Sequence, residues 1–138
     1  MLLHLTRIRN RMKNRNQIDE AKAIANLAGD RKLLIELAQI LSEDLPPLMQ
    51  RLRSAMDQEN RVLTRSLIHK LRNLAATFFA TEIGVLANQI ELDCARGDYD
   101  LLMKNVRRLS EMLQNLLAEV YDRGWSDHLG DFNLPGQG

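Results

Sequence analysis

The sequence has few of the residues that build tight turns, and it has a single cysteine. Among 138 residues there are seven glycines and three prolines, and aromatic residues make up only 4%. A β-sandwich or barrel needs many more turn signals than this. Cys94, the one cysteine, excludes an intramolecular disulfide and fits a reducing compartment. Its amphipathic surroundings predict a small core residue, because no histidine lies nearby in sequence to activate a nucleophile.

Strong charge and long apolar runs are also missing. The net charge is +1, too small to indicate a nucleic-acid partner. No apolar run approaches the length of a membrane span, and the leucines near the N-terminus give way at once to basic residues, unlike a signal peptide. We therefore expect a cytoplasmic protein. Residues 1–17 hold five basic residues and no acidic one, so they are predicted to form a basic extension, and the rest of the chain carries −4.

Leucine-rich periodicity predicts an all-α fold. Apolar residues recur at spacings of three and four, and connections of two to five residues favour antiparallel neighbours. We predict an up-down-up-down antiparallel four-helix bundle over residues 18–121, with a short extra helix at its N-terminal end and a flexible tail over 122–138. The five predicted helices cover residues 18–27, 31–56, 61–80, 83–96 and 99–121.

Two Gly-Asp pairs and one Pro-Pro pair mark helix boundaries. Gly29-Asp30 and Gly97-Asp98 each read as a glycine that ends one helix, followed by an aspartate that caps the next. Pro46-Pro47 predicts a kink or restart within the second helix, because each proline lacks an N–H and collides with the preceding turn.

One histidine lies on the outer side of the third predicted helix. At about 100° per residue, five apolar residues form a narrow stripe and His69 falls almost opposite it. Those stripe residues are Leu63, Leu67, Leu71, Leu74 and Phe78. The predicted neighbours of His69 are Val62, Arg65, Ser66, Arg72, Asn73 and Ala76. From this window alone, a surface histidine without a role is the favoured interpretation.

Several motifs, in order along the chain, reverse that preference. They are Leu27-Ala28-Gly29-Asp30 before the first long helix, Glu43-Asp44-Leu45-Pro46-Pro47, His69-Lys70-Leu71-Arg72-Asn73, the segment from Ile83 to Glu91, and Arg96-Gly97-Asp98. Together they make the chain from about Ile18 to Val120 resemble a histidine-containing phosphotransfer domain, the Hpt module of bacterial phosphorelays. The family pattern around the histidine is His-x-Leu-Lys-Gly.

The resemblance implies a phosphocarrier without autokinase activity. His69 would accept a phosphoryl group from an aspartate of a receiver domain, on the ring nitrogen farther from the backbone, and pass it to another receiver. Arg72 takes the place of the family's lysine and can hydrogen-bond phosphoryl oxygens. The partners implied are response-regulator receiver domains and a hybrid sensor histidine kinase. No metal or other cofactor is expected on this chain, since the receiver would supply Mg²⁺ and the three histidines are far apart in sequence.

Two residues depart from the family pattern. Asn73 replaces the glycine one turn after the histidine, and Phe79 stands where a second glycine is usual. Phe79 could anchor a partner or fill space under a neighbouring helix, and packing is slightly preferred. We expect a shallow docking patch, suited to a transient interface, formed by Val62, Arg65, Ser66, Ile68, Arg72, Asn73, Ala76 and Phe79.

Two other functions compete with phosphotransfer. The dimerisation helix of a sensor kinase also carries His-x-Leu-Arg, but it has an acid after the histidine, where this chain has Lys70, and a proline where this chain has Leu74. A kinase core would be an obligate dimer, whereas we predict a monomer. The second alternative is a helical adaptor that binds receiver domains without phosphotransfer, and Asn73 and Phe79 keep it open.

Overall fold

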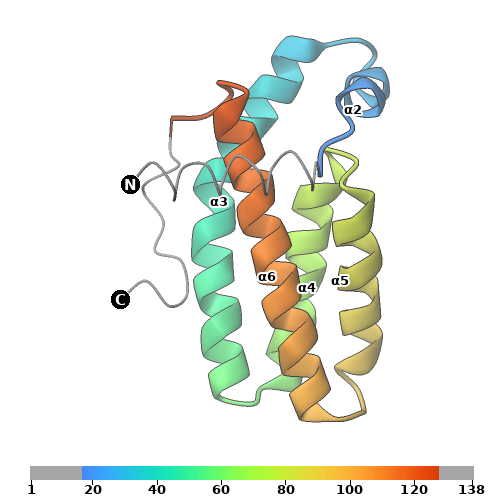
Figure 1. Cartoon of the computed structure of the whole chain (residues 1–138), viewed down its shortest axis with the longest axis vertical. Coiled ribbons are helices and arrows are strands. Elements are labelled where there is room, and N and C mark those ends of the chain that lie inside the picture. The colour runs from blue at the N-terminus through green and yellow to red at the C-terminus, as the bar shows by residue number, and fades with distance from the viewer. Residues whose placement is uncertain (1–16, 128–138) are drawn as a thin grey trace, which may run out of the picture.

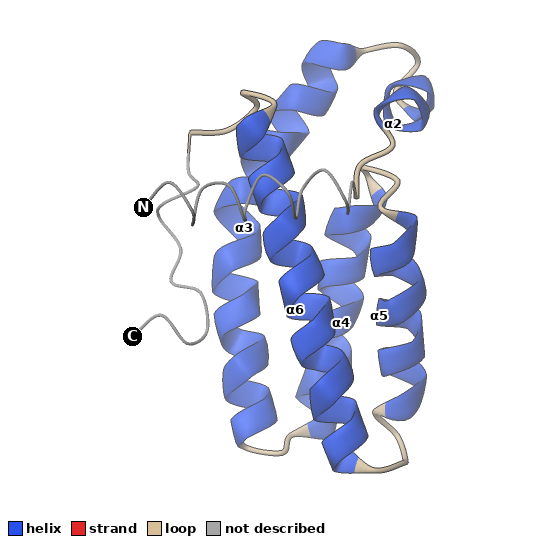
Figure 2. Cartoon of the chain, in the orientation of Figure 1, coloured by secondary structure: helices blue, strands red, loops and turns tan. Residues whose placement is uncertain are grey.

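The computed structural model describes residues 17–127, and this part of the chain contains helices and no strand. The helices are α2 (Glu20–Asn26), α3 (Arg31–Asp57), α4 (Arg61–Ala76), α5 (Thr81–Asp93) and α6 (Tyr99–Asp122). Figure 1 shows the four long helices side by side, with α2 across one end. Figure 2 shows that loops alone connect them. The predicted all-helical fold is confirmed.

Side-chain caps explain where four of the helices begin. Each first turn leaves backbone N–H groups without a helical partner, and a short polar side chain accepts one of them. The caps predicted at Asp30 and Asp98 are both present, with bonds to the amides of Leu33 and Asp100. Asp19 and Asn60 cap α2 and α4 in the same way. Gly29 and Gly97, before the two predicted caps, have φ of +84° and +103°, which suits glycine at a helix C-terminus.

The two prolines bend α3 without ending it. Pro46 and Pro47 lie inside one helix from Arg31 to Asp57, so the predicted restart is wrong. Figure 1 shows the N-terminal part of α3 leaning away from the line of its C-terminal part, which agrees with the kink.

The helix that carries His69 ends earlier than predicted. The periodicity extended it to Ala80, but α4 ends at Ala76 and α5 already begins at Thr81. Phe79 adopts a φ of +51°, a left-handed conformation that stops a helix and is uncommon for a bulky residue. The change of direction at Phe79 is what separates α4 from α5.

Inward-facing leucines and isoleucines from all four long helices form one core. Fully buried side chains from α3 to α6 include Leu34, Leu41, Leu52, Leu67, Leu71, Ile83, Ile90, Leu102 and Leu109. Cys94 is a free, buried thiol in this core, as predicted, and burial raises its pKa. A high thiol pKa keeps the thiolate scarce.

The segments just before α2 and just after α6 are both held in place by contacts with the helices. Glu119 of α6 accepts hydrogen bonds from the backbone N–H groups of Gln17 and Ile18. Trp125 is buried, with the guanidinium groups of Arg31 and Arg123 over its ring at 6.0 and 5.2 Å. The tail was predicted to begin at residue 122, and the burial of Trp125 corrects that prediction. Residues 1–16 of the predicted basic extension, and 128–138 of the tail, lie outside the described residues.

Candidate functional site

His69 projects from the outer side of α4, as the helical pattern predicts. Leu67, Ile68 and Leu71 are fully buried on the inner side of the same helix. The His69 side chain is 51% exposed. Because the buried residues fix the rotation of α4, the imidazole is held in a defined position while it stays accessible from solvent.

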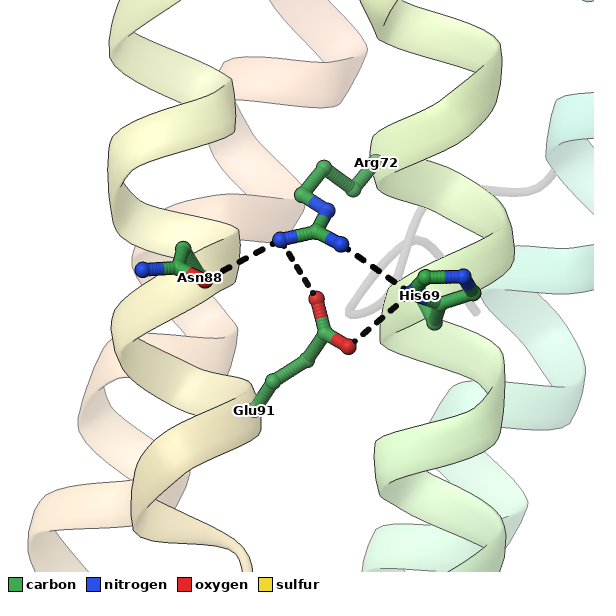
Figure 3. Close-up of polar contacts among 4 residues, drawn as sticks. All are labelled: His69, Arg72, Asn88 and Glu91. Atoms are coloured by element: carbon green, nitrogen blue, oxygen red, sulfur yellow. Dashed lines mark hydrogen bonds and ion pairs between the residues drawn. The ribbon is translucent and has the colours of Figure 1, made fainter.

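One ring nitrogen of His69 has two neighbours. Nδ1 lies 3.0 Å from Oε1 of Glu91 and 3.1 Å from Nη2 of Arg72. A carboxylate can only accept a hydrogen bond and a guanidinium can only donate one. Nδ1 therefore satisfies Glu91 when it carries hydrogen and satisfies Arg72 when it does not. Figure 3 shows the other ring nitrogen turned away from both.

Arg72 joins α4 to α5 through one nitrogen. Its Nη1 donates to Oδ1 of Asn88 at 3.0 Å and lies 3.1 Å from Oε2 of Glu91. The Arg72 side chain is 29% exposed and that of Glu91 is 13% exposed. These four side chains, His69, Arg72, Asn88 and Glu91, form what we call the α4–α5 polar cluster (Figure 3). Partial burial of the cluster strengthens its charged contacts relative to pairs on an open surface.

The sequence of α5 explains how Asn88 and Glu91 reach His69. Ile83, Ala87 and Ile90 are buried against the core. Asn88 and Glu91, three residues apart, share a side of the helix that flanks this buried stripe. His69 contacts Glu91, whereas Arg72, three residues later on α4, contacts Asn88, three residues earlier on α5. Later positions on α4 therefore face earlier positions on α5.

Arg61 holds the end of α5 that carries Glu91. The Arg61 guanidinium donates to the carbonyl oxygens of Cys94 and Gly97 at 3.5 and 3.2 Å and lies 5.1 Å from the centre of the Tyr99 ring. Cations suit a helix C-terminus because the last carbonyls carry partial negative charge. This contact ties the first residue of α4 to the C-terminal end of α5.

Asn88 and Glu91 were not predicted from the sequence. In the sequence, the segment from Ile83 to Glu91 contributes to the family resemblance only as a whole. The available signal was the i, i+3 spacing of an amide and a carboxylate on α5. That signal is weak, because the same spacing occurs on most solvent-exposed helix faces.

Most of the predicted docking residues lie on the surface around His69. Val62, Arg65, Ser66, Asn73 and Ala76 are exposed and Arg72 is partly exposed. These side chains are therefore accessible to a partner, and their role in docking stays a prediction.

Two predicted docking residues are placed differently. Ile68 is fully buried. It directly follows Leu67 and lies three residues before Leu71, so it shares the inward side of α4 with these two buried residues. It therefore cannot contribute to a docking surface. Phe79 lies in the turn after α4, partly buried and packed against the core, so it is not on the helical face that carries His69.

Exposed apolar side chains flank the polar cluster on both helices. Val62 of α4 is 84% exposed, and Val85 and Leu92 of α5 are 67% and 61% exposed. Val85 and Leu92 are seven residues apart, three residues before Asn88 and four after it, so they lie near Asn88 on the helix surface. Sequence reasoning found Val62 and missed the two residues of α5.

The described residues contain neither a membrane-spanning helix nor a cluster of metal ligands. No helix within residues 17–127 is both long and apolar enough to cross a membrane. In the same part of the chain, no three His, Cys, Asp or Glu side chains gather in a way that could hold a metal ion.

Comparison with protein families identifies one match. The model of the Hpt domain matches residues 36–119, which is more than half of the chain and includes all four members of the polar cluster. Comparison with the curated proteins and with the solved structures gave no significant match. The chain belongs to the Hpt domain family, whose members are phosphocarrier modules of two-component signalling.

Proposed function

We propose that His69 accepts a phosphoryl group from the aspartate of one receiver domain and passes it to the aspartate of another. One observation carries the proposal: Nδ1 of His69 is engaged by Glu91 at 3.0 Å, whereas the opposite ring nitrogen, Nε2, is turned away from the polar cluster (Figure 3). A hydrogen on Nδ1 leaves the lone pair on Nε2, where a partner can reach it.

In the accepting step, the Nε2 lone pair forms a bond to phosphorus as the bond between phosphorus and the aspartyl oxygen breaks. The aspartate leaves as a carboxylate, and the ring becomes an Nε2-phosphorylated imidazolium that keeps its hydrogen on Nδ1. No proton has to move. The negative charge of Glu91, 3.0 Å from Nδ1, stabilises the positive charge that develops on the ring.

The donating step reverses these changes. A receiver carboxylate attacks phosphorus, the bond from Nε2 to phosphorus breaks, and the electron pair returns to Nε2. Because Nδ1 keeps its hydrogen, the leaving group is a neutral imidazole. An imidazolate anion would be a far poorer leaving group. The same hydrogen bond to Glu91 therefore assists transfer in both directions.

Arg72 has two possible contributions to this chemistry. Its ion pair with Glu91 at 3.1 Å keeps the carboxylate oriented beside His69. The direct contact with phosphoryl oxygens that the family resemblance implies would require the guanidinium to leave its present position beside Nδ1. We propose the first contribution for the resting protein and the second for the complex with a receiver.

The proposed docking surface surrounds His69 and extends onto α5. Phosphoryl transfer depends on in-line positioning and neutralisation of charge, and an acidic receiver pocket with its Mg²⁺ would supply the metal chemistry. Helix α4 has four basic residues and no acidic one, which suits an acidic partner. Val62, Val85 and Leu92 would provide the apolar contacts. We further propose that a hybrid sensor kinase acts upstream and that the chain is a monomer. The helices would follow an up-down-up-down order, and the protein would be located in the cytoplasm.

The deciding experiment incubates the chain with phosphorylated receiver domains. The wild type is expected to gain acid-labile phosphate, and His69→Gln is expected to gain none while keeping its helical circular dichroism. If the wild type gains no phosphate but still binds receivers, the adaptor function replaces phosphotransfer. Gel filtration of the wild type tests the monomer, because a sensor-kinase core would elute as a dimer.

A further inference from the structure

The two residues about one turn after His69 on α4 lie on opposite sides of it. Arg72 is three residues further and Asn73 is four. At about 100° per residue, Arg72 is rotated about 60° to one side of His69 and Asn73 about 40° to the other. Arg72 is on the side of α5, because it bonds to Asn88. Asn73 therefore lies on the side of His69 that is turned away from α5.

The imidazole ring is divided between the same two sides. Nδ1 lies toward α5, 3.0 Å from Glu91 and 3.1 Å from Arg72. Figure 3 shows Nε2 turned away from both. A phosphoryl group on Nε2 would therefore stand on the side of Asn73, whereas the guanidinium of Arg72 is held beside the other ring nitrogen.

Asn73 has the reach and the chemistry to contact that group. Residues four apart on a helix have Cβ atoms about 5–6 Å apart, and helical side chains lean toward the N-terminus, which brings the Asn73 amide toward His69. The amide NH₂ carries two donors. Asn73 is exposed, and within residues 17–127 its side chain makes no hydrogen bond, so no contact there has to break.

Ser66 is the other polar residue on this side of His69. It lies three residues before the histidine, which places it about 60° around the helix in the direction of Asn73. Its side chain leans toward the N-terminus and so away from His69. Asn73 is therefore the better-placed donor.

We propose that the side-chain amide of Asn73 donates a hydrogen bond to a phosphoryl oxygen on Nε2 of His69 and so stabilises the phosphorylated form of the chain. A glycine, the usual family residue at this position, has no side-chain donor. The inference deepens the proposed phosphotransfer and rests on it for its functional consequence. The contact itself requires only a phosphoryl group on Nε2.

The first experiment measures the equilibrium constant for phosphoryl transfer from a receiver aspartate to His69 in the full chain. Asn73→Ala should lower the constant about fivefold, the effect expected for one hydrogen bond. Asn73→Asp should lower it further, because a carboxylate repels the phosphoryl group. An equilibrium constant compares free reactants with free products, so a change in receiver docking alone would not alter it. Gln89→Ala is the matched control, because Gln89 is exposed on α5 and bonds to Asp93, and it should keep the wild-type constant.

The second experiment needs no receiver. Phosphoramidate serves as a small phosphoryl donor: its bond from phosphorus to nitrogen breaks, ammonia leaves, and Nε2 of His69 bonds to phosphorus. In ¹⁵N–¹H spectra of the full chain, the side-chain amide protons of Asn73 should move downfield on phosphorylation, and those of Gln89 should not.

An unchanged equilibrium constant in Asn73→Ala overturns the inference, as does an Asn73 amide resonance that stays in place in the phosphorylated chain. A constant in Asn73→Asp at or above that of the wild type would overturn it too. If phosphoramidate phosphorylates His69 and moves the Asn73 resonance but no receiver transfers phosphate, the contact is supported and the proposed function is refuted instead.

Discussion

Two glutamates on neighbouring helices bind two groups each, but the groups differ in kind. Glu91 of α5 contacts the side chains of His69 and Arg72. Glu119 of α6 accepts hydrogen bonds from the backbone N–H groups of Gln17 and Ile18. A backbone amide cannot change its protonation state, whereas an imidazole can. Glu119 is therefore suited to holding the segment before α2 in place, and Glu91 is suited to controlling the chemistry of His69.

Burial separates the two carboxylates further. The Glu91 side chain is 13% exposed at a surface that a partner could cover, and Glu119 is 5% exposed at the end of the bundle. Burial raises the pKa of Glu119, although the two backbone hydrogen bonds and Arg123 act in the opposite direction. Substituting each glutamate by glutamine keeps the size of the side chain and removes its charge, so the pair of variants tests the comparison directly.

The largest effect is expected for Glu91→Gln on the rate of phosphoryl transfer. The amide no longer balances the positive charge that develops on His69, and its NH₂ group can donate to Nδ1 and favour the tautomer with hydrogen on Nε2, which cannot attack phosphorus. We expect the single-turnover rate from a phosphorylated receiver to fall about 100-fold, as for loss of one oriented electrostatic contact. The free energy of unfolding in urea should fall by about 1 kcal/mol, because the variant loses the partly buried ion pair with Arg72. A rate within about twofold of wild type would remove Glu91 from the mechanism.

Glu119→Gln is expected to lose stability and keep transfer. The amide retains one acceptor oxygen, but its NH₂ group faces a backbone N–H and leaves that donor without a partner. We expect the free energy of unfolding in urea to fall by about 2 kcal/mol, with an unchanged transfer rate. Glu111→Gln is the matched control, because Glu111 is exposed on the same helix. Equal stability of the two variants would contradict the anchoring role of Glu119.

Arg72→Ala should have a smaller effect on transfer than Glu91→Gln. Glu91 keeps its contact with Nδ1 in this variant but loses its ion pair, and the phosphoryl group loses a nearby cation. We expect transfer to slow about tenfold, equivalent to about 1.4 kcal/mol of barrier, with the fold intact. The double variant with Glu91→Gln should slow by less than the product of the two single effects, because the residues act on one another. An unchanged rate in Arg72→Ala would exclude Arg72 from the mechanism.

Local chemistry explains why the helices could be predicted from the sequence. The apolar period of 3.6 residues and the caps at Asp30 and Asp98 each depend on residues within a few positions, so the sequence displays them. The end of α4 could not be found this way. Nothing between Ala76 and Ala80 breaks a helix by composition, and the stop depends on the left-handed conformation of Phe79, which the packing of the turn imposes.

The site was predictable on α4 alone. His69 and Arg72 are one turn apart on one helix, and a family pattern marks them. Asn88 and Glu91 reach them only because α5 packs beside α4 in a particular register, and single-helix periodicity does not determine register between helices. For the same reason the sequence did not reveal Glu119, whose partners lie 101 and 102 residues away, or the burial of Trp125.

The smallest effect expected is a pH dependence of stability that Glu119 imposes. A raised pKa means that the folded protein binds the Glu119 proton more tightly than the unfolded chain does. As pH rises from the ordinary value of 4.5 toward the pKa of the folded protein, the unfolded chain therefore loses this proton first. Over that interval stability falls with pH, by at most about 1.4 kcal/mol per unit, and above it the contribution is constant.

Glu119→Gln removes this titration, so the stability of the wild type minus that of the variant should decrease as pH rises from 4.5. Urea unfolding of both proteins at a series of pH values measures the difference. A difference that increases with pH would mean that the bonds from Gln17 and Ile18 outweigh the cost of burying the charge. The contrast between the two carboxylates would then rest on the nature of their partners alone.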